Sequence, residues 1–182
     1  MRRRQFIKGL SASLPFAGFV LATTSSARAD ATQLQHRWRQ LLPTDFEVVA
    51  VDPKLSTSLD QWRTQLPSAA YDVLFEEDTE RPGTSPLNQE KRAGLYLCRA
   101  CELPLFTSEM KYDSGTGWPS FFTHIPGHFG KKTDFKLIWP RTEYHCAKCG
   151  GHQGHVFDDG PPPTGERWCN NGVALRFVPK EA

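Results

Sequence analysis

The chain has 182 residues, 38% of them hydrophobic and 12% aromatic, which is enough for the core of one domain with a small appendage. Five of its 22 basic residues and none of its 20 acidic residues fall within the first 29 positions, so the rest of the chain carries a net charge of −3. This balance excludes the basic footprint of a nucleic-acid-binding protein, and we expect no nucleic-acid partner.

The first 29 residues have the layout of an export signal. A basic segment at residues 2–8 precedes an apolar stretch, about residues 9–22, that is too short to span a membrane. Residues 27–29, Ala-Arg-Ala, form the small-x-small pattern of a cleavage site, and residues 3–8 resemble the twin-arginine signals that carry folded bacterial proteins across a membrane. An uncleaved anchor or a basic tail is the alternative. We expect a twin-arginine signal peptide at residues 1–29, recognised by the twin-arginine export machinery, a periplasmic location and no stable membrane insertion after cleavage.

The next part of the chain predicts short helices. Apolar residues recur at helical spacing in residues 34–42 and again in residues 59–66, and each segment ends before a proline. Ser68 is expected to be the N-cap of a third helix that reaches Phe75. We interpret these apolar stripes as surfaces that pack against the main domain.

From about residue 94 the pattern changes to short apolar runs between turn signals. The chain has 14 glycines and 14 prolines, which favours many turns and a β-rich fold. The sequence therefore predicts a mainly β (α+β) domain of antiparallel sheets with a few small N-terminal helices. The expected strands are residues 95–97, 136–139, 143–145, 154–157 and 173–178.

Four of the five cysteines form two Cys-x-x-Cys pairs. Cys98 and Cys101 make the first pair, and Cys146 and Cys149 make the second. Two-residue spacing lets both sulfurs of a pair reach one ion, and four thiolates are the ligand set of a closed tetrahedral zinc site. Two structural disulfides, which an exported protein can form, and thioredoxin-like redox pairs are the alternatives. We expect one structural zinc ion.

Cys169 is the cysteine left over. If zinc takes the other four, no second free thiol remains to form a disulfide with it. A cysteine reacts as its thiolate, and a free thiol is mostly protonated at neutral pH. Arg167, two positions earlier, could lower the pKa of Cys169 together with a nearby imidazole. The alternative is a buried, inert cysteine.

Three further motifs occur in order with the cysteine pairs: Ser-Gly-Thr-Gly-Trp-Pro-Ser-Phe at residues 114–121, Gly-His-Val-Phe-Asp-Asp-Gly at residues 154–160 and Arg-Trp-Cys-Asn-Asn at residues 167–171. Together they resemble the methionine-R-sulfoxide reductase family (the B type), from about Leu59 to Phe177. The resemblance implies two antiparallel sheets with zinc at one end and the lone cysteine on a central strand. It also implies an enzyme that reduces the R epimer of methionine sulfoxide in oxidised peptides and proteins and so repairs oxidative damage.

The resemblance assigns roles to single residues. Cys169 attacks the sulfoxide sulfur, releases methionine and becomes a sulfenic acid. Reduction also needs a proton on the departing oxygen, and His is the common donor near neutral pH. Because side chains alternate along a strand, Asn171 is expected on the same side as Cys169 and Arg167. By the same resemblance, His155 and Asn171, with His152, bind or protonate the sulfoxide oxygen. Trp118 packs on the ε-methyl group, and Arg167 supports the thiolate.

Thr116 departs from one pattern found in the family. Some members carry a second cysteine at this place, where it resolves the sulfenic acid as an internal disulfide. Thr116 has no thiol. We therefore expect a one-cysteine cycle in which a small thiol or a thioredoxin-like partner reduces Cys169 directly.

The expected organisation is a signal peptide at residues 1–29, an N-terminal extension at residues 30–58 and a catalytic domain at residues 59–179, acting as a monomer. Two rival functions stay open. One is a non-catalytic zinc-ribbon binding module, which would be expected to carry a basic face. The other is a hydrolase with a zinc-bound water, which four cysteine ligands disfavour because they leave no open position on the metal.

Overall fold

A computed structural model of the protein describes residues 30–44, 46–48, 51, 57–136 and 139–181. The predicted signal peptide lies outside the described residues, as does part of the predicted extension. Within the described part of the chain, no helix combines the length and the apolar character needed to cross a membrane.

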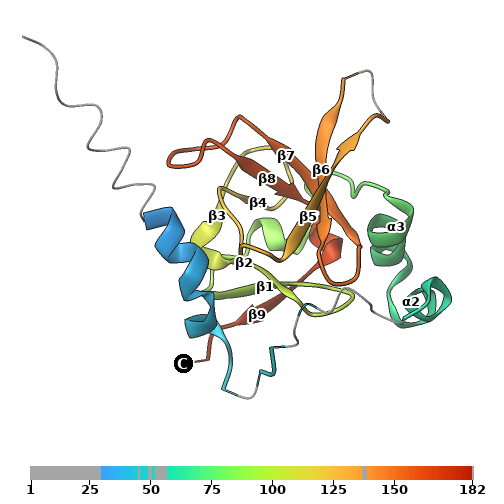
Figure 1. Ribbon diagram of the computed structural model, residues 1–182, viewed down its shortest axis with the longest axis horizontal. Helices are drawn as coiled ribbons and strands as arrows, with labels where there is room; N and C mark the ends of the chain where they lie inside the picture. The colour runs from blue at the N-terminus through green and yellow to red at the C-terminus, as the bar shows by residue number, and fades with distance from the viewer. Residues whose placement is uncertain (1–29, 45, 49–50, 52–56, 137–138, 182) are drawn as a thin grey trace, which may run out of the picture.

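Two antiparallel sheets form the body of the molecule (Figure 1). One has the strand order β2-β1-β9 and the other the order β3-β4-β8-β7-β6-β5. The predicted mainly β fold is confirmed, although the last strand starts at Leu175 because residues 172–174 form a short 3-10 helix. The strands are β1 (Gly94–Cys98), β2 (Pro104–Thr107), β3 (Lys111–Tyr112), β4 (Ser120–Phe121), β5 (Phe129–Asp134), β6 (Arg141–Cys146), β7 (His152–Phe157), β8 (Arg167–Asn170) and β9 (Leu175–Pro179).

Aromatic side chains fill the space between the sheets. Phe106 of β2 stacks on Phe121 of β4, with ring centroids 3.9 Å apart and 6° between the ring planes. Trp168 of β8 meets Tyr144 of β6 edge-on at 4.8 Å, and all four side chains are fully buried. Each such side chain removes roughly 150–250 Å² from water. The packing of Trp168 therefore fixes β8, the strand that also contains Cys169.

Short helices precede the sheets, as the apolar spacing predicted, and they dock through buried tryptophans. Trp38 meets the ring of His128 edge-on at 5.4 Å, and Trp62 stacks on Phe75 of the following helix at 5.8 Å. The expected N-cap at Ser68 is wrong by one position, because the preceding proline takes the N-cap conformation. The helical segments are residues 30–37, η1 (Trp38–Leu41), α2 (Leu59–Gln65), α3 (Ser68–Glu76), η2 (Pro86–Asn88), η3 (Ser108–Met110) and η4 (Gly172–Ala174).

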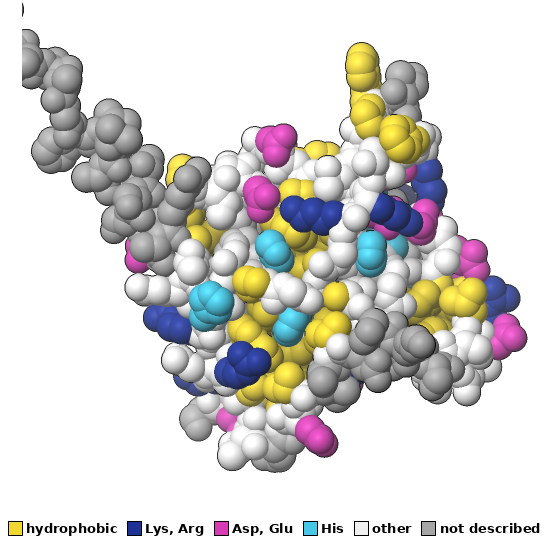
Figure 2. All heavy atoms as spheres, viewed as in Figure 1, with side chains coloured by type: hydrophobic (Ala, Val, Ile, Leu, Met, Phe, Trp, Pro, Cys, Tyr) yellow, Lys and Arg dark blue, Asp and Glu magenta, His cyan; other side chains and the backbone are white. Residues whose placement is uncertain are grey.

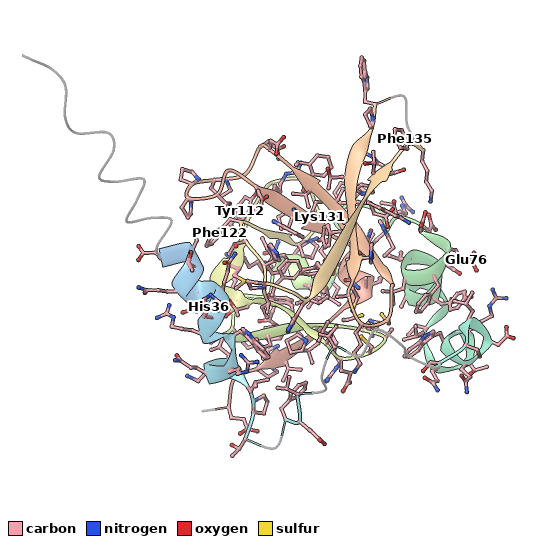
Figure 3. All side chains as sticks on the ribbon, viewed as in Figure 1. His36, Glu76, Tyr112, Phe122, Lys131 and Phe135 are labelled. Carbon is pink, nitrogen blue, oxygen red and sulfur yellow. The ribbon has the colours of Figure 1, made fainter. Side chains whose placement is uncertain are left out.

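The β5–β6 hairpin differs from the strand predicted at residues 136–139. Residues 137–138 lie outside the described residues, and Lys136 and Trp139 are bends. β5 comes earlier and escaped prediction because its middle is polar and exposed, so it shows no apolar alternation. Figure 3 shows the hairpin reaching beyond the body with Phe135 near its end, and Figure 2 shows apolar surface there; the side chains of Phe135 and Trp139 are 75% and 77% exposed.

Candidate active site and metal cluster

The two Cys-x-x-Cys pairs come together in one cluster. Their four sulfur atoms all lie within 4.8 Å of one another, and the pairs Cys98–Cys149 and Cys101–Cys146 are 3.6 Å and 3.5 Å apart. A tetrahedral zinc with Zn–S bonds of about 2.3 Å would hold its sulfurs about 3.8 Å apart. No disulfide joins any two of these cysteines in the structure. The cluster could hold a metal ion of zinc's size and preference.

The surroundings of the cluster also fit a cation. The backbone N–H of Gly151 donates to Sγ of Cys149 at 3.4 Å, and the side chain of Gln153 donates to Sγ of Cys98 at 3.5 Å. Both donors stabilise negative charge on sulfur. Hydrogen bonds among the sulfurs raise the pKa of Cys98 and lower the pKa of Cys101, because a thiol that donates a proton to its neighbour stays protonated and stabilises the neighbouring thiolate. Full ionisation of the four sulfurs therefore calls for a positive ion among them.

Cys169 lies in the middle of the six-stranded sheet, on β8. It faces His155 of β7 on one side and Ser120 of β4 on the other. Directly opposed residues of antiparallel strands point to the same face. Gly154 permits this close pairing, because a Cβ atom there would lie 1.9 Å from the carbonyl oxygen of Cys169. The register thus brings together a thiol and an imidazole that are 14 positions apart in sequence.

The pairing of β6 with β7 skips Gln153, which forms a β-bulge. In a regular strand, residues three apart would face opposite sides. The bulge changes this, and the rings of His152 and His155 lie 5.5 Å apart. His152 is buried, with Nδ1 3.0 Å from Oε1 of Glu143 at an angle outside hydrogen-bonding geometry. Only His155 belongs to the wall of the cavity described next, so His152 stands behind it.

A cavity of about 210 Å³ opens over Cys169. The structure brings five of the predicted residues to its wall, along with the threonine that replaces a second cysteine. Thr79, Arg141 and Phe157 also line the cavity, and no role was predicted for them. The five predicted residues in the wall are Trp118, His155, Arg167, Cys169 and Asn171, and the threonine is Thr116.

Glu80, in the loop after α3, holds two sides of the cavity. Its carbonyl oxygen accepts a 2.9 Å hydrogen bond from Nε1 of Trp118, and its backbone N–H donates to Oδ1 of Asn171 at 3.0 Å. Its carboxylate accepts from the backbone N–H groups of Gly172 and Val173. Sequence reasoning missed Glu80, because nothing in a loop sequence indicates which distant backbone groups it will meet.

Asn171 reaches the cavity by a different route from the one expected. β8 ends at Asn170, so strand alternation does not extend to Asn171. Its backbone leads into η4, and its Nδ2 donates to the backbone carbonyl of Gln153 at 3.1 Å. The amide is therefore held at both ends, by Glu80 and by Gln153.

Arg167 is held by Asp159 in a bidentate pair. Nε and one terminal nitrogen of the guanidinium donate to the two carboxylate oxygens at 2.7 and 2.9 Å, and the guanidinium lies 4.2 Å from the ring centroid of Phe157. Burial raises the pKa of Cys169, while Arg167 and a hydrogen bond with Thr116 act in the opposite direction. The expected lowering by Arg167 is present, but the expected net result is wrong because desolvation of the thiolate is larger.

His155 is positioned by Asp134 at the end of β5. Nε2 of His155 lies 2.8 Å from Oδ2 of Asp134, which also accepts from Arg141 at 2.6 Å. These bonds and the backbone N–H of Lys136 lower the pKa of Asp134, so its carboxylate stays ionised. Burial lowers the pKa of His155, and Asp134 partly offsets this. Asp134 is a second residue that the sequence did not reveal, since it lies in the strand that escaped prediction.

Comparisons with known proteins give one answer. The family model described as "SelR domain" matches residues 66–179. Proteins named "Peptide methionine sulfoxide reductase MsrB" match from Agrobacterium fabrum (49% identity over 128 residues, 70% of this chain and 95% of the relative) and Pseudomonas putida strain W619 (49% over 129 residues, 70% and 97%). The protein of that name from Bradyrhizobium diazoefficiens is 45% identical over 137 residues, 75% of this chain and 99% of the relative. Among solved structures, the Mis18 "Yippee-like" domain aligns over 50% of this chain and 100% of that chain at a TM-score of 0.40 and 12% identity, too weak a likeness to bear on the fold.

Proposed function

Because the chain belongs to the SelR-domain family and is a peptide methionine sulfoxide reductase, we propose that Cys169 reduces the R epimer of methionine sulfoxide in oxidised peptides and proteins. The observation that carries this proposal is the cavity that joins the Cys169 thiol, the indole of Trp118, the imidazole of His155 and the amide of Asn171. These are a nucleophile, an apolar wall, a proton carrier and a hydrogen-bond donor. Together they repair oxidised methionine.

The chemical step balances without an outside proton. Sγ of Cys169 attacks the sulfoxide sulfur, the oxygen moves to the cysteine sulfur, and methionine leaves. The cysteine sulfur is oxidised by two electrons and the sulfoxide sulfur is reduced by two. The proton that the thiol gives up ends on the oxygen, so the products are a sulfenic acid and a thioether.

The electrostatics of the cavity support a neutral starting pair. Burial raises the pKa of Cys169 and lowers the pKa of His155, so the resting site holds a thiol and an uncharged imidazole. His155 is the cross-strand neighbour of Cys169 and is held by the ionised Asp134. It is the group that carries the thiol proton to the sulfoxide oxygen, and the carboxylate stabilises the imidazolium that forms on the way.

Trp118 and Asn171 orient the substrate in the cavity. The indole of Trp118 is fixed by its hydrogen bond to Glu80 and supplies an apolar surface for the ε-methyl group. Asn171 is fixed in the wall, and its amide polarises the sulfoxide oxygen. His152 acts behind His155, beside Glu143. Arg167 supports the developing thiolate from its place against Asp159.

The four-cysteine cluster is proposed to hold one structural zinc ion. Cys98 ends β1 of the three-stranded sheet, and Cys146 ends β6 of the six-stranded sheet. A bound zinc would supply a cross-link between the two sheets, with all four positions taken by sulfur. The protein's own contribution is the pair of tight turns that present the sulfurs and the N–H donors that face them.

The sulfenic acid is proposed to be reduced from outside the chain. Thr116 occupies the cavity wall beside Cys169, and the other four sulfurs belong to the metal cluster. One external thiol attacks the sulfenic sulfur to form a mixed disulfide and water, and a second thiol releases the cysteine. A thioredoxin-like protein or a small thiol fits this chemistry.

We further propose that residues 1–29 direct the protein to the periplasm by the twin-arginine route, ahead of an extension at residues 30–58 and a monomeric catalytic domain at residues 59–179. The support is the basic, apolar and small-residue order of the segment. Replacing Arg3 and Arg4 by lysine should keep the protein in the cytoplasm, as cell fractionation would reveal. Export at the wild-type level would contradict the proposed route.

Reductase assays on a peptide carrying each resolved epimer, with dithiothreitol as the reductant, test the proposed reaction. The wild-type protein should reduce the R epimer and leave the S epimer untouched, and Cys169→Ser should be inactive while folding normally. Turnover of the S epimer at a similar rate would refute the stereochemistry. Full activity of Cys169→Ser would refute the nucleophile.

A further inference from the structure

Gln153 lies between the metal cluster and the cavity. It is the bulge residue of β7 and its side chain is completely buried. A buried primary amide is costly unless its donors and acceptor are all engaged. The role of Gln153 can therefore be inferred from the hydrogen-bond partners of its side chain.

The orientation of the amide follows from its neighbours. Nδ2 of Asn170 donates to the carbonyl oxygen of Asn171 at 2.8 Å, and Oδ1 of Asn170 accepts from the hydroxyl of Tyr144 at 2.8 Å. The Asn170 amide is thereby fixed, with Nδ2 also 3.4 Å from Oε1 of Gln153. The carbonyl end of Gln153 thus faces Asn170. Its Nε2 donor points the other way, to Sγ of Cys98 at 3.5 Å.

The backbone of Gln153 makes a second connection, to Asn171, the residue that follows β8. Its carbonyl oxygen accepts from the backbone N–H of Asn171 at 2.9 Å and from Nδ2 of Asn171 at 3.1 Å. One residue therefore bonds to a metal-cluster sulfur, to the residue after Cys169 and to the amide in the cavity wall.

We propose that Gln153 is a positioning residue that holds the Cys98 sulfur as a metal ligand and ties the metal cluster to the catalytic strand. An N–H donor aimed at a thiolate disperses its charge and fixes its orientation, as outer partners of metal ligands do. The same side chain then restrains Asn170 on β8. The inference rests on the zinc ion of the proposed function and is independent of the reductase chemistry.

Gln153→Met removes the amide and keeps the length of the side chain. The variant should fold, because Asn170 keeps its bonds to Asn171 and Tyr144 and the backbone bonds of residue 153 are unchanged. Gln35→Met is the matched control. It removes a partly buried amide whose 2.6 Å hydrogen bond to Thr123 ties residues 30–37 to the β domain, away from both sites.

The first readout is zinc release from the full, zinc-loaded protein to a colorimetric chelator. Gln153→Met should release zinc about tenfold faster than wild type or more, whereas Gln35→Met should not differ. In the cobalt-substituted protein, the sulfur-to-metal charge-transfer band should move to lower energy in Gln153→Met alone. Hydrogen exchange of the peptide that covers β8 and Asn171 should also speed up relative to the control.

The proposal would be overturned if Gln153→Met released zinc at the wild-type rate and its cobalt charge-transfer band did not move. Wild-type protein that binds no zinc would instead refute the proposed cofactor. Should Gln153→Met fail to fold, the cadmium-substituted wild-type protein decides the matter by NMR. A scalar coupling between cadmium and the side-chain amide protons of Gln153 is expected, and its absence would overturn the proposal.

Discussion

The four-cysteine cluster and the cavity over Cys169 are built in different ways. The cluster uses two turns with the same local spacing, one after β1 and one between β6 and β7. The cavity uses side chains from the loop after α3, the loop before β4 and strands β6, β7 and β8. Local spacing therefore suffices to recognise the cluster. The cavity depends on strand register and on one bulge, which no local pattern displays.

The two regions should also fail in different ways. With the proposed zinc ion in the cluster, loss of one of its cysteines should remove the link between the sheets and impair folding. Loss of a cavity residue acts on the reaction and leaves most of the core untouched. Four single substitutions separate these outcomes.

Cys98→Ser should prevent stable folding. Structural zinc contributes on the order of 10 kcal/mol of folding free energy, and a domain's whole net stability is about 5–15 kcal/mol. Metal content and circular dichroism of the purified variant would measure the loss. Cys169→Ser is the matched control, since it also removes one thiol and should keep zinc and fold. A folded, zinc-free Cys98→Ser protein would show that the cluster has no structural role.

Asp134→Asn should lower kcat at neutral pH by about tenfold or more, within the range of general acid–base catalysis. The carboxylate favours protonated His155, while burial, Arg141 and His152 disfavour it. Without the carboxylate the pKa of His155 falls further, so the imidazole accepts the thiol proton less readily and the acid limb of the profile, where resting His155 becomes protonated, moves to lower pH. The pH profile of kcat would record this shift. The exposed Asp72→Asn change on α3 is the control, and identical profiles for both variants would contradict the role of Asp134.

Glu80→Gln should reduce kcat/KM by about tenfold with a stability loss of about 1.5–3 kcal/mol, the usual range for a hydrogen bond to a charged group. The carboxylate anchors the backbone of Gly172 and Val173, and the same residue holds Trp118 and Asn171. Steady-state kinetics and thermal unfolding measure both effects. Glu76→Gln, which removes only an exposed ion pair with Arg63, should change neither quantity by much. Loss of stability with unchanged kcat/KM would limit Glu80 to a structural role.

Arg167→Met should raise the pKa of Cys169 and reduce kcat/KM a few-fold. The guanidinium lowers that pKa through its charge and a hydrogen bond, against the larger effect of burial. The midpoint of iodoacetamide alkylation of Cys169 should therefore move to higher pH. Arg176→Met removes an equal charge from β9, where the side chain pairs with Glu102, and should leave the midpoint in place. A shift to lower pH in Arg167→Met would reverse the assigned sign.

The sequence predicted the parts of this protein that rest on local patterns. Doubled cysteine spacing led to the cluster, and apolar strands such as β1 led to the fold class. Most of the cavity wall came from the three motifs that carry the family resemblance, since no local pattern displays the strand register. Asp134 was missed because an exposed edge strand has polar residues without alternation. Glu80 was missed because its contacts are backbone groups from distant segments. The resemblance placed His152 and His155 at the same site, and it is the bulge at residue 153 that brings their rings together.

A single turnover without reductant distinguishes the nucleophile from the four cluster cysteines. The wild-type protein is mixed with excess R-sulfoxide peptide, trapped with a sulfenic-acid reagent and digested for mass spectrometry. One methionine per chain and one trapped sulfenic acid at Cys169 are the predicted result, with the four cluster cysteines unmodified. An internal disulfide between Cys169 and a cluster cysteine, or turnover with Cys169 unoxidised, would contradict the division of the five cysteines into four ligands and one nucleophile.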